Sequence, residues 1–279
     1  MHLVCLGVVK RMLFYLKSGP KECRLSAGQI SEISDSLVYL NGKFPSEFAR
    51  QPRSLYELER WKATEFRQFL LYSGPVVLKK VVSKKLYEHF LALMIAISIL
   101  LDSNDEKRLH YMCYAKQLLK YFVHGCKDLY TDIFVPYNVH NLLHVPDDVE
   151  NFGCSLNKIS AFPFENHLQG IKRLVKNAKN PLAQVTKRLA ELETFGKKPK
   201  MFNSKHEVAF VSTRHKDSCF LLQSEDFAFV KEKKADGKLV CNVIKQKDVQ
   251  NFFEKPCPSN LINIVFIDRR TKSSRKLLE

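Results

Sequence analysis

Apolar residues recur at helical spacing along most of the first two hundred positions, which predicts a mainly helical region. One run places Ile30, Ile33 and Leu37 on a single face behind Ser26, which is expected to cap the helix. Helical segments are predicted over residues 1–16, 26–40, 55–72, 87–101, 105–122, 137–144 and 164–193, the last with a break at 180–181. The dipeptide Gly74-Pro75 is expected to end the third of these segments.

The pattern changes after residues 196–200, where Gly-Lys-Lys-Pro-Lys separates the helical region from short alternating segments. Strands with polar turns are predicted over residues 207–212, 218–223, 227–231, 239–245 and 261–268. The predicted fold class is therefore α+β, with a mainly helical region over residues 1–200 and a small β-rich domain over residues 201–279. The chain ends in a basic tail, residues 269–276. It is expected to be a nuclear import signal, a second phosphate contact, or a frayed and solvated terminus.

Composition and charge narrow the classes of function. The chain has 279 residues, 45% of them apolar, and a formal net charge of +16. It is long enough for a buried core, and its charge favours polyanions such as DNA. A basic surface that serves only solubility is the alternative. The longest apolar run, residues 90–101, is too short to cross a membrane and predicts a buried helix, so no membrane partner is expected.

The cysteines and the beginning of the chain indicate an intracellular protein. Eight cysteines are scattered without a Cys-x-x-Cys pair, which disfavours zinc ribbons and fingers. Lys10 and Arg11 interrupt the early apolar run, so no signal peptide is recognised. Reduced thiols are the expected state of the cysteines.

Basic side chains gather in two regions that predict contacts with DNA phosphates. One is the helical stretch after residue 164, and the other surrounds Trp61, whose ring is expected to pack in the core. The candidate DNA-binding residues are Lys172, Arg173, Lys176, Lys179, Arg53, Lys62 and Arg67. If about six phosphates are neutralised, the logarithm of affinity falls with the logarithm of salt concentration at a slope of about −5. Such binding is expected to be mostly non-specific, because no base-reading motif is present.

Seven short strings occur in order over the first 165 residues. They are MHLVCLGVVK (1–10), PRSL (52–55), WKATEFR (61–67), YSGPVVL (72–78), NVHNLLH (138–144), DDV (147–149) and FPFE (162–165). Together they resemble the catalytic region of CACTA-type (En/Spm-like) cut-and-paste DNA transposases and of their domesticated relatives in animals. The strand-rich C-terminal part resembles that family less closely.

The resemblance implies an RNase H-like core with a long helical insertion and a triad of two aspartates and a glutamate that binds two metal ions. Glu165 matches the final glutamate of the triad, and His2 matches the histidine of an Asp-x-x-His element whose aspartate would precede Met1. Both catalytic aspartates would lie upstream of this sequence. Asp148, beside Asp147, is the nearest substitute, although this pair after Pro146 is more typical of a helix start.

These observations predict a transposase-derived, nuclear, DNA-associating protein without strand-transfer activity as the chain stands. No cofactor is expected in this chain, and Mg²⁺ would bind at Glu165 only if upstream aspartates completed the triad. One alternative is a protein-interaction remnant that binds a partner or forms a homo-oligomer without binding DNA. A weaker alternative is a zinc-dependent hydrolase built on His140 and His144, which lie four residues apart as metal-binding pairs do.

Overall fold

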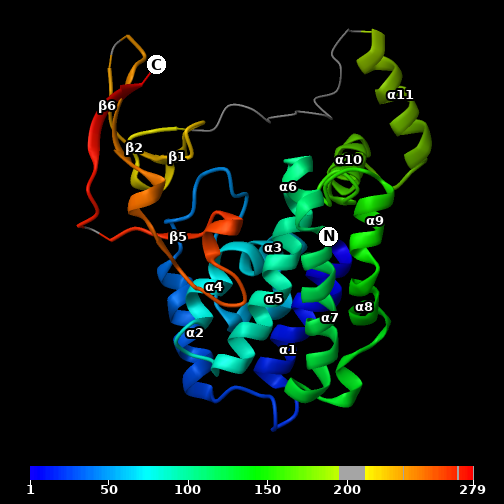
Figure 1. Cartoon of the computed structure of the whole chain (residues 1–279). Coiled ribbons are helices and arrows are strands. Elements are labelled where there is room, and N and C mark those ends of the chain that lie inside the picture. Colours follow the sequence, from blue (N-terminus) through cyan, green and yellow to red (C-terminus); the bar gives the residue numbers. More distant parts are fainter. Residues whose placement is uncertain (195–210, 235, 269, 279) are drawn as a thin grey trace.

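A helix that is apolar on nearly every side, α5 (Lys84–Leu101), lies at the centre of the molecule (Figure 1). The structure is a computed structural model that describes residues 1–194, 211–234, 236–268 and 270–278. Ser83 caps α5, since its hydroxyl accepts a hydrogen bond from the Leu86 N–H at 3.3 Å. Of the 18 residues of α5, 13 are buried, and a helix of this kind needs neighbours all round it.

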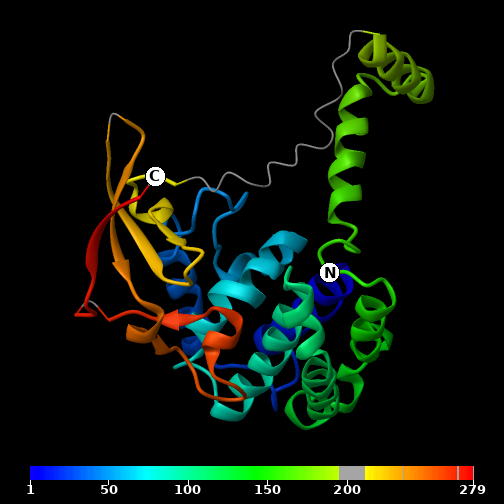
Figure 2. The same ribbon diagram turned by 45° about the horizontal axis from the view of Figure 1, so that its top comes forward.

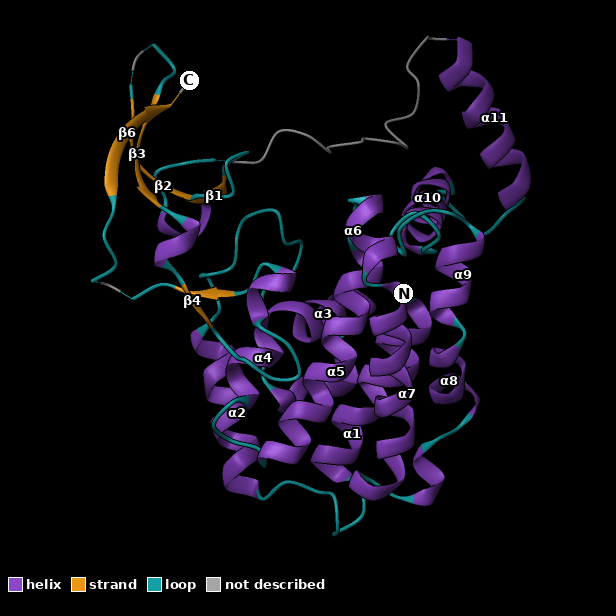
Figure 3. Ribbon diagram, in the orientation of Figure 1, coloured by secondary structure: helices purple, strands orange, loops and turns teal. Residues whose placement is uncertain are grey.

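Short helices supply that cover (Figure 3). They are α1 (Lys10–Ser18), α2 (Ala27–Tyr39), α3 (Ala63–Gln68), α4 (Gly74–Leu78), α6 (Asp105–His110), α7 (Met112–Leu129), α8 (Tyr137–His140) and α9 (Val145–Asn151). A π-helical stretch, Leu3–Val9, precedes α1 and buries four side chains. The closest neighbour of α5 is α7, where Gly125 has no room for a larger residue because a Cβ would lie 3.0 Å from the His89 ring.

Some predicted helix boundaries are confirmed and others are wrong. The helix predicted over residues 105–122 is divided into α6 and α7, and α7 continues to Leu129. Ser26 caps α2 and forms a reciprocal capping box with Gln29. The dipeptide Gly74-Pro75 does not end a helix but begins α4, because proline in a first helical turn loses no hydrogen bond. Gly74 is needed there, since a Cβ would lie 2.6 Å from both the Phe69 carbonyl oxygen and the Phe90 ring.

The strands follow the helices and form a small antiparallel sheet in the order β1-β2-β3-β6. They are β1 (Cys219–Leu221), β2 (Phe227–Lys233), β3 (Leu239–Ile244) and β6 (Ser274–Leu278), and a separate pair is formed by β4 (Gln250–Asn251) and β5 (Val265–Phe266). A small apolar cluster that includes Val230 and Cys241 lies within the larger sheet. The α+β class is confirmed, whereas an RNase H-like core stays a prediction.

Two predictions for the C-terminal part need correction. Residues 261–268 are mostly not a strand: a 3₁₀ turn, Ser259–Ile262, occupies the beginning, and only β5 follows. The end of the basic tail is not frayed, because β6 pairs with β3 from Leu239↔Leu278 to Val243↔Ser274. The strand predicted over residues 207–212 falls almost wholly outside the described residues.

The C-terminal part does not stay apart from the helices. Phe253 and Cys257 are buried in the same apolar core as α5. Ser46, in the connector after α2, donates from its backbone N–H and its hydroxyl to the Asp217 carboxylate at 2.6 and 2.9 Å. The predicted domain boundary at residue 200 lies outside the described residues and stays a prediction.

Among the described residues, no helix is both long enough and apolar enough to cross a membrane.

Candidate functional site

The two residues that the resemblance singled out, His2 and Glu165, lie together. His2 Nε2 is 2.8 Å from Glu165 Oε1, and the His2 ring lies 4.5 Å from the ring of Phe162, centroid to centroid. Glu165 occupies the first turn of α10 (Phe162–Leu174), where a carboxylate is favoured by the helix dipole. The π-helical stretch after His2 is held by buried side chains, so the contact joins the beginning of α10 to the helical body.

This pair does not fit a two-metal site. The neighbour of Glu165 is an imidazole, whereas Mg²⁺ prefers oxygen ligands. Within the described ranges, no three His, Cys, Asp or Glu side chains lie close enough to hold a metal ion. A histidine beside a carboxylate is able to exchange protons, but more than half of the Glu165 side chain is exposed. The geometry therefore supports a contact that positions α10, and no catalytic step follows from it.

The region beyond Glu165 is a two-helix projection, which we call the arm (residues 162–194). It consists of α10 and α11 (Pro181–Thr194), and Figures 1 and 2 both show it standing off the helical body. The predicted break at Asn180-Pro181 is confirmed, with Asn180 in the left-handed region at a φ of 50°. No described side chain of the arm is buried. Every described side chain of the arm is therefore at least partly exposed.

The arm carries six basic side chains and three carboxylates. Its basic residues are Lys172, Arg173, Lys176, Lys179, Lys187 and Arg188, and all six are exposed. Within the described part of the chain, Arg188 alone among them has an ion-pair partner, Glu191, at 3.1 Å. Lys172 and Arg173 lie in the last turn of α10, but Lys176 follows the end of the helix, so the helical stretch predicted to reach residue 179 ends earlier.

Gln184 orders the segment between the two helices. Its Oε1 accepts from the Lys176 backbone N–H at 2.9 Å, and its Nε2 donates to the Lys179 carbonyl at 2.6 Å. Gln184 therefore holds the backbone at both lysines, while the two lysine side chains remain exposed. This role could not be predicted from the sequence, because a lone glutamine at a helix start has no distinctive pattern.

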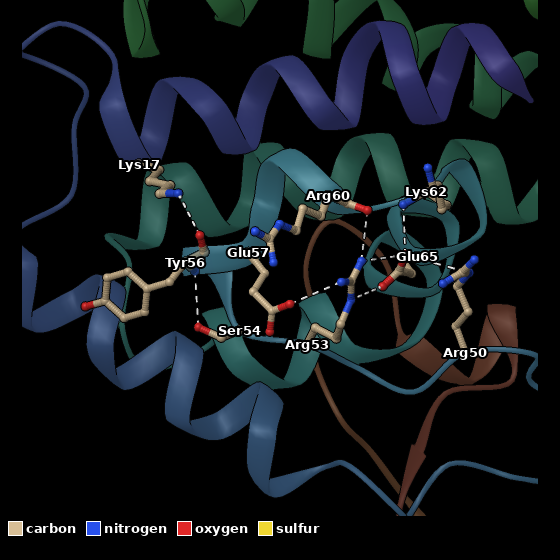
Figure 4. Close-up of polar contacts among 9 residues, drawn as sticks. All are labelled: Lys17, Arg50, Arg53, Ser54, Tyr56, Glu57, Arg60, Lys62 and Glu65. Atoms are coloured by element: carbon tan, nitrogen blue, oxygen red, sulfur yellow. Dashed lines mark hydrogen bonds and ion pairs between the residues drawn. The ribbon is translucent and has the colours of Figure 1, made fainter.

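Arg53, a predicted DNA-binding residue, is held within the protein. Figure 4 shows its guanidinium between two carboxylates: Nε is 2.6 Å from Glu65 Oε1, and Nη1 is 3.2 Å from Glu57 Oε2. Nη2 donates to Glu65 Oε2 at 3.0 Å and to the Arg60 carbonyl at 2.9 Å. The hydrogen bond to Glu65 is the main cause that raises the pKa of Arg53. With every donor nitrogen engaged, Arg53 stabilises the fold around a buried carboxylate.

Lys62 and Arg67 lie near this network but differ in availability. The Lys62 side chain is exposed, and its backbone N–H donates to Glu65 Oε2 at 2.8 Å. Arg67 donates from Nη2 to Asn157 Oδ1 at 2.8 Å. Trp61 is buried against Phe66 and Phe69, which confirms its predicted place in the core.

The remaining candidates lie in α8 and at the beginning of α9. His140 and His144 are exposed, with ring centroids 5.7 Å apart, and the described residues add no third ligand to them. Asp147 and Asp148 lie in the first turn of α9. Lys116 Nζ is 2.9 Å from Asp147 Oδ1, and this hydrogen bond lowers the pKa of Asp147. This pair is a helix start with a surface ion pair, as the sequence suggested.

Comparison with other proteins identifies no family. No family model matches the chain, and neither a curated protein nor a solved structure matches it. The resemblance to CACTA-type transposases therefore stays a prediction, carried by the seven strings alone.

Proposed function

We propose that this chain associates with DNA through the phosphate contacts of the arm. The observation that carries the proposal is that the arm projects from the body, buries none of its described side chains and carries six exposed cations. Cations without local carboxylate partners are free to exchange their counterions for phosphates, which is the main source of non-specific affinity for DNA.

The arrangement of the arm favours a phosphate backbone over a single small anion. Its cations come from the end of α10, the anchored link and α11, so they are spread along an extended element rather than gathered in a cavity. A helix pair of this kind offers no set of polar side chains that would read base edges, so contacts to phosphate and sugar dominate. We therefore propose binding that is largely independent of sequence.

We also propose an origin and a location for the protein. The chain derives from a CACTA-type transposase, acts in the nucleus and lacks strand-transfer activity in this form. Its support is the resemblance carried by the seven strings, in which Glu165 matches the final glutamate of the triad. Two-metal phosphoryl transfer uses several carboxylates around the metals, whereas the described contact of Glu165 is with the His2 imidazole.

Fluorescence anisotropy of a labelled DNA duplex over a series of KCl concentrations tests the proposal. For the wild-type chain we expect a slope of log affinity against log salt of about −5, and for the triple variant Lys172→Gln, Arg173→Gln, Lys176→Gln a slope of roughly −2.5, because three phosphate contacts are lost. The matched control, Lys80→Gln, Lys84→Gln, Lys85→Gln, removes three exposed cations from the helical body and should keep the wild-type slope. Glu165→Gln should also leave DNA binding unchanged.

Equal losses in both triple variants would show that only the overall charge matters and would reject the arm as the site. A slope near zero in the wild type would instead favour the protein-interaction alternative. That second candidate rests on Phe164, Leu168 and Leu182, apolar arm side chains that are 69%, 62% and 78% exposed. In that case the apolar face of the arm would cover a partner's surface, and the basic face would serve solubility.

A further inference from the structure

A cavity of about 410 Å³ lies where the helical body meets the C-terminal part of the chain. Its walls come from the end of α5, from α6, from the residues around Arg67 and from the 3₁₀ turn Ser259–Ile262 with the two residues that follow. Cavities of this size hold small ligands, and they are common where two parts of a protein meet. None of the candidate residues of the arm lines it.

The charged lining of this cavity is predominantly basic. Three cations line it, Arg67, Lys107 and Arg108, with a single carboxylate, Asp102. Lys107 Nζ lies 3.4 Å from Asp102 Oδ2, so this carboxylate already has a cation beside it. Arg67 is bonded to the neutral Asn157 and, among the described residues, has no carboxylate partner. The remaining positive charge favours an anionic ligand.

Arg108 provides the second, independent sign of a ligand. Its side chain is 98% buried, and Nη1 donates to the Asp102 carbonyl at 2.9 Å and lies 2.7 Å from Asp105 Oδ1. Its Nε is buried and, within the described chain, has no hydrogen-bond partner. A buried donor without an acceptor costs about 1–3 kcal/mol, and more when the group is charged, so a ligand acceptor that reached Nε would relieve this cost.

The other walls suit a flat apolar body. Leu71 and Ile99 line one side and Ile262 another, and Tyr72 and Tyr111 bring aromatic rings to the cavity. Aromatic side chains stack on nucleobases without regard to their identity. A phosphate monoester has three acceptor oxygens, which arginine forks bind with more geometric specificity than a point charge does.

We propose that this cavity binds a phosphate monoester of nucleotide size, with its phosphate at Arg67, Lys107 and Arg108 and its base against the tyrosines. The same chemistry occurs in a free mononucleotide and in the 5′-phosphate end of a DNA strand. The site contains no residue of the arm, so it can be tested independently of the proposed DNA contacts.

Isothermal titration calorimetry of the whole chain tests this site with four probes: AMP, adenosine, and a short single-stranded oligonucleotide with and without a 5′-phosphate. We expect saturable binding of one AMP per chain and no binding of adenosine. The two oligonucleotides are compared in the triple variant of the arm, where the 5′-phosphate should add one saturable site to whatever backbone contacts remain. Arg67→Gln and Lys107→Gln should each weaken AMP binding at least tenfold. Arg108 is kept, because its removal would leave a void in the core.

Lys116→Gln is the matched control, since Lys107 and Lys116 are equally exposed (32%) and both contact carboxylates. It should bind AMP as the wild type does, and so should the triple variant of the arm. Binding of AMP assigns the site to free nucleotides, and an added site for the 5′-phosphorylated oligonucleotide alone assigns it to strand ends. The proposal is overturned if neither phosphate monoester binds more tightly than its unphosphorylated counterpart, or if both cavity variants bind as tightly as the wild type.

Discussion

At the scale of single residues, the availability of a charge depends on its partner. Arg53 and Lys172 have the same charge, and the sequence predicts that both contact DNA. In the fold, Arg53 holds the buried carboxylate of Glu65, whereas Lys172 is exposed on the arm. Glu65 is 4% exposed, and no spacing rule shows that a glutamate twelve residues after an arginine is buried beside it.

The contact between Arg53 and Glu65 leads to a prediction about stability. Glu65→Gln should lower the free energy of unfolding by about 2–3 kcal/mol, because a half-exposed arginine loses its charged partner while the amide remains buried. Urea denaturation measures the difference. Glu57→Gln is the control, because Glu57 also contacts Arg53 but is 45% exposed, and it should cost less than about 1 kcal/mol. Equal losses at the two positions would contradict this account of the network.

At the scale of elements, helix starts were easier to predict than helix ends and strands. Ser26 with Gln29 is a local signal, and the structure uses it as predicted. Gly74-Pro75 is a local signal too, but close packing of Gly74 on Phe90 overrides its usual meaning. Strand β6 was missed because its partner β3 lies far away in the sequence, and the basic residues of the tail concealed it. The His2–Glu165 contact was hidden for the same reason.

The packing of α5 on α7 predicts a dependence of stability on pH. His89 of α5 is fully buried, donates from Nε2 to the Phe122 carbonyl of α7 at 2.8 Å and stacks on the Phe122 ring. Burial lowers the pKa of His89 from 6.5 to about 4. The unfolded chain therefore binds the proton more readily, so stability present above pH 6.5 is lost as the pH falls towards 4, to a total of about 3 kcal/mol.

The variant His89→Gln isolates this effect, because glutamine can still donate to the Phe122 carbonyl but does not titrate. It should be less stable than the wild type at neutral pH yet lose much less stability on acidification to pH 5. Urea unfolding at neutral and mildly acidic pH gives both slopes. Parallel slopes for the two proteins would mean that another group causes the acid sensitivity.

At the scale of the whole molecule, the change from helices to strands does not coincide with a division of the core. The sequence predicted the order of the two regions and the α+β class, because periodicity reports which local structure forms. It carried no information that Phe253 and Cys257 return to the core around α5. Lys79 adds to this attachment, with its ammonium 4.0 Å from the centre of the Phe252 ring. The cavity is lined by residues of both regions.

Because Phe253 and Cys257 pack in the core around α5, we expect that changing such a residue of the C-terminal part destabilises the helical body. Phe253 is 7% exposed within the core of α5, so Phe253→Ala should lower the free energy of unfolding by about 3 kcal/mol and the helix signal in circular dichroism should melt earlier. Phe266→Ala is the matched control, because Phe266 is 46% exposed, and its effect should be less than about 1 kcal/mol. If Phe253→Ala left the helical transition unchanged, the helices would be stable without the C-terminal part, and the phosphate cavity would lack a fixed wall.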